Sequence, residues 1–180
     1  MWVPVNNTPI IIDTDGSGFH LTSAANGIKW DFYGNGSPVQ IAWTVPGSTN
    51  GWLAMPDDKG NVPNARQLFS SIAPQDLSKA DNGFNALATY DTNGDGVINA
   101  QDYPWWGKLR VWIDSNHNGL VDPGELRTLD SLGITGISLA YESSPKTDQY
   151  GNQFKLKGRL IRAPDDHVNR VIYDVTLTTK

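Results

Sequence analysis

The chain has 180 residues with 14 basic and 19 acidic side chains, a net charge of −5 and no cysteine. A chain of this length buries one sizeable core, so we expect a single domain over residues 1–180. We also expect a monomer. The acidic balance argues against a nucleic-acid surface, and the lack of cysteine excludes disulfides, thiol catalysis and Cys-ligated zinc. No apolar run approaches the roughly 18 residues of a membrane span, and no signal-peptide pattern opens the chain, so we expect neither a span nor a cleaved N-terminal signal.

The first half of the chain predicts short strands joined by tight turns. The β-branched run at 8–13 is typical of a buried strand, and it ends in an Asp-Gly loop. Between Phe19 and Met55, apolar stretches alternate with Asn-Gly and Pro-Gly pairs, which favours a meander of hairpins. A short helix is expected near Ala65–Ile72.

The second half predicts a mixture of helices and strands. Apolar spacing predicts a helix over Gly83–Tyr90, and alternation predicts a strand over Leu109–Ile113. Pro123 to Leu132 is expected to be a helix, because Pro stands in its first turn and Gly133 follows its last. Further strands are expected at 134–141, 153–161 and 170–178. The predicted fold class is α+β: one domain of short β-strands and hairpins, with EF-hand-like calcium loops and a few short helices.

The acidic residues point to calcium. Seventeen of the 19 are Asp, a residue of tight turns, and only Glu125 and Glu142 are Glu. The segment 114–125 fits the EF-hand loop, with side-chain oxygens at its first, third and fifth positions, Gly119 at the sixth and a Glu at the twelfth. The predicted ligands are Asp114, Asn116, Asn118, Leu120 through its carbonyl, Asp122 and Glu125. Leu109–Ile113 would lead into this loop, giving a strand–loop–helix unit.

The segment 91–102 is a second copy of the same pattern. It matches at the first, third, fifth and sixth positions, but its twelfth residue is an aspartate, one methylene shorter than glutamate. Closure around a cation should therefore be looser than in the loop 114–125. The predicted ligands are Asp91, Asn93, Asp95, Val97 through its carbonyl, Asn99 and Asp102.

A third candidate loop follows the first predicted strand. It carries oxygen donors at Asp13, Asp15 and Ser17 and offers the Phe19 carbonyl, but Ala24 stands at its twelfth position. A cation site completed from elsewhere and a simple turn at a strand end are both open here. We therefore predict Ca²⁺ as the cofactor, bound at two sites, with a third site at this loop if it is a cation site and not a simple turn.

Other reactive residue types carry little signal. The three histidines are isolated in sequence, His117 is expected to face solvent, and no nucleophile motif is present. Trp105, Trp106 and Trp112 flank the calcium loops and are expected in the core. Other tryptophans, at positions 2, 43 and 52, could stack on sugars.

The chain resembles the self-processing module of secreted repeat-in-toxin (RTX) proteins. The resemblance is carried, in order, by TPIIIDTDGSG, WDFYGNG, NGFNALATYDTNGDGVINAQD, LRVWIDSNHNGLVDPGELRTLDSLGITGISLAY and YDVTL, from about Pro9 to Leu177. It implies a calcium-loaded fold and a secreted bacterial setting, with the rest of a larger secreted chain as a partner.

The resemblance also implies self-cleavage, at an Asp-Pro bond before the first strand. In that family the Asp carboxylate attacks its own carbonyl, and the anhydride that forms is hydrolysed or captured by a lysine. The matching bond here is Thr8-Pro9, which has no carboxylate, so we expect no catalytic residue and no such cleavage. Asp122-Pro123 is the only Asp-Pro pair, and we interpret it as part of the calcium loop.

These observations leave three functions. The first is a calcium-binding module that folds or becomes rigid with the metal. The second is a calcium-triggered module that cleaves itself and ligates lysine, inactive here because of Thr8. The third is an adhesion or carbohydrate-binding module that uses exposed tryptophans.

Overall fold

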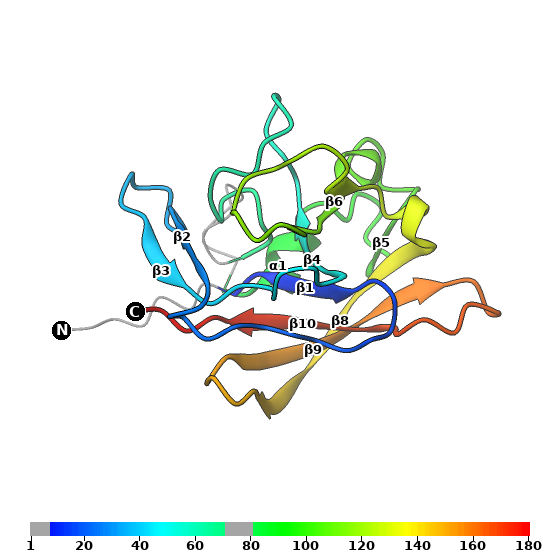
Figure 1. The fold of residues 1–180 in the computed structure, drawn as a ribbon. Coiled ribbons are helices and arrows are strands. Elements are labelled where there is room, and N and C mark those ends of the chain that lie inside the picture. Colours follow the sequence, from blue (N-terminus) through cyan, green and yellow to red (C-terminus); the bar gives the residue numbers. More distant parts are fainter. Residues whose placement is uncertain (1–7, 71–80) are drawn as a thin grey trace.

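A computed structural model describes residues 8–70 and 81–180 (Figure 1). Within these ranges the strands are β1 (Ile10–Asp13), β2 (Ile28–Trp30), β3 (Val39–Ile41), β4 (Asn50–Ala54), β5 (Val97–Asn99), β6 (Arg110–Trp112), β7 (Leu126–Arg127), β8 (Ile134–Thr147), β9 (Gln153–Arg162) and β10 (Val171–Thr176). The helical elements are α1 (Gly83–Ala88) and two 3-10 turns, η1 (Trp106–Lys108) and η2 (Asp130–Leu132). None of the described helices is long and apolar enough to cross a membrane.

The described strands form one large antiparallel sheet and a small one. The large sheet has the order β5-β8-β9-β10-β1-β4-β6-β7, and β2 pairs with β3. Strand β1, early in the chain, lies between β4 and β10, so the sheet joins the two ends of the sequence (Figure 1). Such long-range pairing places residues 8 and 9 beside the C-terminal strand.

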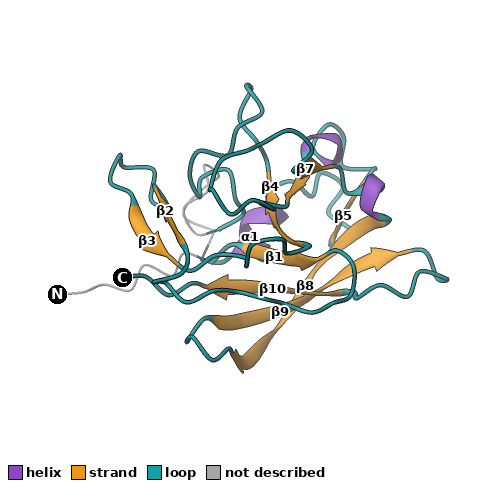
Figure 2. Cartoon of the chain, in the orientation of Figure 1, coloured by secondary structure: helices purple, strands orange, loops and turns teal. Residues whose placement is uncertain are grey.

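The α+β prediction was wrong, because the described chain is mostly β. Figure 2 shows strands and loops with little helix, and within residues 8–70 and 81–180 the one α-helix, α1, has six residues. The predicted helix from Pro123 to Leu132 is absent: Leu126 and Arg127 pair with β6, and only η2 is helical. Cross-strand pairing outweighed the local leucine spacing. Gly133 does end η2, with φ 71°.

The helix predicted at Ala65–Ile72 is also absent over its described part. Leu68 forms a β-bridge with Ala54, and the Met55 N–H donates to the Gln67 carbonyl. These long-range hydrogen bonds use backbone groups that a helix would need internally. Residues 71 and 72 lie outside the described residues.

The strands predicted at 8–13, 109–113, 134–141, 153–161 and 170–178 are present. Of the meander predicted between Phe19 and Met55, β2 and β3 pair as a hairpin, whereas β4 pairs with β1 and β6. Two cores lie on opposite faces of the large sheet. Side chains alternate along a strand, so Ile10 and Ile12 enter one core while Ile11 enters the other. The first core also holds Phe84, Leu87 and Ile98, and the second holds the tryptophan cluster. The helix α1, which the sequence predicted over Gly83–Tyr90, packs its apolar side into the first core.

Candidate functional site

The loop Asp114–Glu125 connects β6 to β7, so it is a strand–loop–strand unit rather than the strand–loop–helix unit predicted. Its first residue, Asp114, is 1% exposed. One carboxylate oxygen accepts the Asn118 N–H at 3.1 Å, and the other accepts the Gly119 N–H at 2.8 Å and the Trp43 indole N–H at 2.8 Å. The first position thus holds the turn of the loop and ties it to the second core.

The twelfth residue closes this loop. Glu125 Oε1 accepts the N–H of Ser115 at 2.9 Å, and Oε2 accepts the N–H of Asp122 at 3.1 Å. Glu125 is 5% exposed, so its charge is stabilised by these donors more than by water. The carboxylate therefore joins the second and ninth positions of the loop.

The side chains at the third, fifth and ninth positions converge. Asp122 Oδ2 accepts hydrogen bonds from the amides of Asn116 and Asn118, each at 2.8 Å. These two bonds hold the pKa of Asp122 below its usual range. At the seventh position Leu120 exposes its side chain, and its N–H donates to Asn118 Oδ1 at 2.8 Å.

The loop Asp91–Asp102 has the same hydrogen-bond pattern. Asp91 accepts the Gly94 N–H at 2.8 Å on one oxygen and the Gly96 N–H at 2.9 Å on the other. Asp102 accepts the Thr92 N–H at 2.8 Å and the Asn99 N–H at 2.9 Å, so it too joins the second and ninth positions.

The environment of Asp102 holds its carboxyl ionised. Burial acts to raise the pKa of Asp102, but the N–H groups of Asn99 and Thr92 outweigh it and leave the pKa below its usual value. An anionic side chain at the closing position is what a cation site needs.

Inside this loop the side chains converge less completely. The Asn93 amide donates to Asp95 Oδ2 at 3.0 Å, whereas the Asn99 side chain accepts the Gln101 N–H at 2.8 Å. Val97 begins β5, which pairs with β8. The side chains at the third and fifth positions are therefore hydrogen-bonded to each other, whereas the side chain at the ninth position is hydrogen-bonded to the backbone of Gln101.

The part of the chain that the structure describes holds no group of three or more His, Asp or Glu side chains gathered closely enough to bind a metal by themselves. A cation in either loop would need Asn oxygens and main-chain carbonyls as well. Both loops supply such groups, and calcium in them remains a prediction.

The third candidate loop is closed by a residue from the far end of the chain. Asp13 is fully buried and accepts the N–H groups of Gly16 at 3.0 Å and Gly18 at 2.9 Å, and Asn169 Nδ2 donates to it at 3.1 Å. Hydrogen bonds from the Ser17 side chain and backbone lower the pKa of Asp15 to about 2. The Phe19 ring packs on Phe154 and Tyr173.

The tryptophans are largely structural. Trp106 is 7% exposed and Trp112 is fully buried, as predicted, while Trp105 is only partly buried. Trp43 and Trp52 are fully buried, so neither can stack on a sugar from solvent. Residue 2 lies outside the described residues. His117 does not simply face solvent, because its ring nitrogens lie 2.7 Å from the Thr44 carbonyl oxygen and 3.1 Å from that of Asn26.

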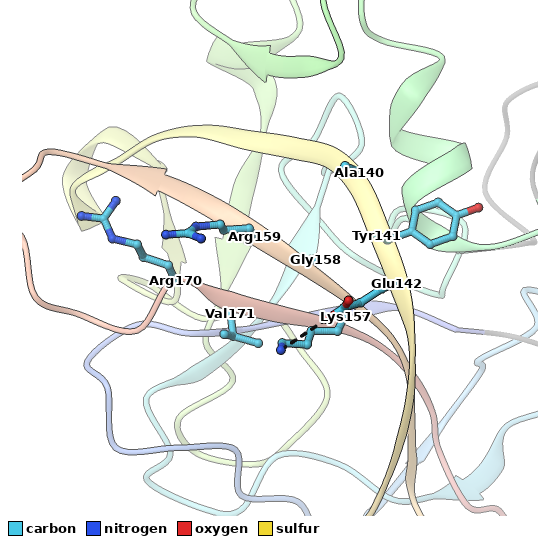
Figure 3. Close-up of a pocket in the computed structure, with 8 residues that line it drawn as sticks. All are labelled: Ala140, Tyr141, Glu142, Lys157, Gly158, Arg159, Arg170 and Val171. Atoms are coloured by element: carbon cyan, nitrogen blue, oxygen red, sulfur yellow. Dashed lines mark ion pairs between the residues drawn. The ribbon is translucent and has the colours of Figure 1, made fainter.

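A basic hollow opens on β8–β10, away from the residues predicted from sequence (Figure 3). Figure 3 shows Arg159 and Arg170 side by side, with Tyr141 pointing away from them. Arg170 donates to the carbonyl of Arg162, the last residue of β9, and to the carbonyls of Ala163 and Asp166, and so holds the β9–β10 connection. The ion pair between Lys157 and Glu142, at 3.4 Å, is exposed and contributes little to stability.

The Thr8–Pro9 bond lies in a packed setting. Thr8 is 3% exposed, and the Pro9 carbonyl accepts the Val175 N–H at 3.0 Å. A Cβ atom on Gly83 would lie 3.1 Å from the Thr8 carbonyl oxygen and 2.7 Å from that of Phe69, so glycine permits this close approach.

A buried carboxyl accompanies this bond. Asp174 is fully buried, and its Oδ2 accepts the Gly83 N–H at 2.6 Å. Burial raises the pKa of Asp174 to about 7, and the Gly83 N–H, the nearby Thr8 hydroxyl and the Lys155 charge only partly oppose that effect. The Thr8 hydroxyl is outside hydrogen-bond geometry, so Thr8 Oγ1 and Asp174 Oδ1 have no hydrogen-bond partner among the described protein groups.

Sequence reasoning missed Asp174 and the Trp43–Asp114 bond. One signal for Asp174 was present: a lone carboxylate in the apolar strand VIYDVT, which is unusual in a core strand. Nothing in the local sequence links Trp43 to a loop 71 residues away.

Comparison with known proteins assigns a family. The SPM domain family model matches residues 10–178, a range that begins just after the Thr8–Pro9 bond. The chain is 36% identical over 155 residues to the iron-regulated protein FrpA of Neisseria meningitidis serogroup C. The aligned region covers 83% of this chain and only 14% of that protein. The chain belongs to the SPM domain family.

Proposed function

We propose that this chain is a calcium-binding module of a larger secreted bacterial protein, and that it folds or becomes rigid when Ca²⁺ enters the loops 91–102 and 114–125. One observation carries the proposal: the same carboxylate bridge, from the twelfth position to the second and ninth, recurs in both loops. Simple turns need no such closure.

The residues that would hold the cations are the twelve predicted ligands, and each set mixes carboxylate, amide and carbonyl oxygens, the donors that calcium prefers. Bound Ca²⁺ would supply a positive centre for carboxylates that otherwise repel one another. Two cations would change the net charge from −5 to −1. A third could use Asp13, Asp15, Ser17 and the Phe19 carbonyl.

Two observations support a module within a larger, secreted protein: the length of the relative and the oxygen donors of the loops, which are of the kind that calcium prefers. The aligned region is a small part of FrpA, which supports a module within a longer chain. Calcium is abundant outside cells, and extracellular modules bind it with modest affinity. Calcium would then act as a folding signal after export.

Thermal unfolding, followed by tryptophan fluorescence, tests the proposal in millimolar calcium and in EGTA with excess magnesium. One site at a free calcium of 100 times Kd adds about 2.7 kcal/mol, and about 2–4 °C per kcal/mol is expected at this size. We expect Tm to rise by about 10 °C or more. Identical curves in both conditions would contradict the proposal.

Self-processing is a second candidate function, favoured by the buried carboxyl beside the Thr8–Pro9 bond. Thr8 has no carboxylate, so the chain as it stands lacks the nucleophile of the family reaction. The substitution Thr8→Asp, with calcium added, tests whether the rest of the site is competent.

A further inference from the structure

The cavity at the Thr8–Pro9 bond has an unusual lining. It measures about 220 Å³ and is lined by Thr8, Asp81, Asn82, Lys155, Leu156 and Asp174. Two of its oxygens, Thr8 Oγ1 and Asp174 Oδ1, are buried without a hydrogen-bond partner among the described groups. A buried polar atom without a hydrogen-bond partner destabilises the folded state, so its presence requires an explanation.

The neighbouring groups hold the Asp174 carboxyl at the bond. Asp174 is opposite Ile10 in the β1–β10 register, one residue from Pro9. Its Oδ2 is held by Gly83, the same residue that the Thr8 carbonyl approaches, so Oδ1 is the oxygen left for the cavity. This arrangement suits a carboxyl at position 8 better than a threonine hydroxyl, because a carboxyl reaches further and presents two oxygens.

We propose that Asp174 is a positioning residue in a latent processing site: its carboxyl O–H donates to one oxygen of an aspartate at position 8 and aims the other oxygen at the carbonyl carbon of residue 8. The inference rests on the second candidate function, self-processing. In the present chain Thr8 leaves Asp174 without that acceptor.

The reaction balances with one water molecule. The introduced carboxylate attacks its own carbonyl carbon, a cyclic anhydride forms, and the bond to the Pro9 nitrogen breaks. The nitrogen takes a proton from water, and the remaining hydroxide opens the anhydride. Asp174 keeps its proton throughout.

The proposal predicts a two-sided pH profile. Cleavage needs the introduced carboxyl ionised and Asp174 protonated, because two carboxyls in one buried site share a proton. The other charged groups that face Asp174 from the described elements are Asp81, ahead of α1, and Lys155 on β9. The lining residue on β9 next to Lys155, Leu156, carries no charge.

Intact mass of the whole chain in calcium measures the reaction, since a cut after residue 8 removes the first eight residues. We expect Thr8→Asp to cleave, and Thr8→Asn, of the same shape but unable to form the anhydride, to stay intact. Adding Asp174→Ala to Thr8→Asp should slow cleavage at least tenfold. Adding Asp174→Asn, which keeps a hydrogen-bond donor, should preserve cleavage and remove its alkaline limb.

Each contrary result has a distinct meaning. Equal rates and pH profiles for Thr8→Asp with and without Asp174→Ala would overturn the role of Asp174. If Thr8→Asp keeps the calcium-dependent fluorescence change of Thr8→Asn but never cleaves, the latent site is refuted and calcium-dependent folding stands. If the unmodified chain shows no calcium response, the calcium proposal fails as well. Should Asp174→Ala not fold, the pH profile of the Asp174→Asn pair decides alone, and an unchanged alkaline limb refutes the inference.

Discussion

The two aspartate-rich loops share one hydrogen-bond pattern but differ in their surroundings. Asp114 is buried and accepts the Trp43 indole N–H, whereas Asp91 is partly exposed and accepts hydrogen bonds from its own loop. Two further contacts hold the loop 114–125 against neighbouring segments. The Gly47 N–H donates to the Ser115 carbonyl, and the His117 ring lies within hydrogen-bond distance of the Thr44 carbonyl. The loop 91–102 is tied to the sheet through β5 instead.

The difference separates two effects of one sequence motif. The twelve-residue pattern determines how each loop closes on itself. The residues that surround each loop determine whether its closure also stabilises the core. We therefore expect changes in the loop 114–125 to affect the folded state even without calcium, and changes in the loop 91–102 to act mainly through calcium.

The largest effect is expected from Asp114→Ala. It leaves the Trp43 indole N–H buried without an acceptor and removes two loop hydrogen bonds, a loss of about 3–5 kcal/mol. Unfolding by urea in EGTA should show most of this loss. The matched variant Asp91→Ala should lose stability mainly in calcium, and equal losses of the two variants in EGTA would erase the distinction.

On the first-core side, Asp174 should make stability depend on pH. Its pKa in the folded state, about 7, is above the unfolded value of 3.8. Its contribution is therefore fully present below pH 3.8 and is lost as pH rises through 7, by at most about 4 kcal/mol. Asp174→Asn should flatten this decline, so that the variant is more stable than the parent above pH 7 in urea titrations. A decline of unchanged slope would argue against a raised pKa.

The closing carboxylates allow each loop to be tested separately for calcium. Glu125→Gln and Asp102→Asn keep the shape, remove the charge and lose one of the two backbone N–H hydrogen bonds that each carboxylate accepts. Each should remove one site's share of the calcium stabilisation, about 2.7 kcal/mol at 100 times Kd. Calorimetric titration should then find one fewer site in each variant, and an unchanged stoichiometry in both would count against these loops.

The smallest effect compares the sixth positions. Gly119 and Gly96 both have positive φ, 71° and 82°. A Cβ on Gly119 would also lie 2.8 Å from Ile28 Cδ1, whereas one on Gly96 meets nothing within 4 Å. Gly119→Ala should therefore destabilise by about 1–3 kcal/mol more than Gly96→Ala, measured by thermal unfolding in EGTA. Equal effects would mean that the backbone strain alone matters.

Local sequence determined the features whose physics is local. The β-branched run before Asp13 predicted β1, and the twelve-residue pattern located two loops. The structure shows that the first residues of these loops, Asp91 and Asp114, accept N–H groups from their own loops. Alternating apolar residues predicted β6, and strands were also expected where β8, β9 and β10 lie. In each of these cases the cause lies within about a dozen residues, so it is visible in the chain itself.

Only the tertiary structure decided the features that join distant segments. Leu126 and Arg127 form a strand because they pair with β6, so the fold is mostly β rather than α+β. The tertiary structure also buried Trp43 against Asp114, and it placed Asp174 beside Thr8 across the β1–β10 register. Burial and cross-strand pairing depend on which distant segments come into contact after folding, and a local sequence pattern does not specify those contacts.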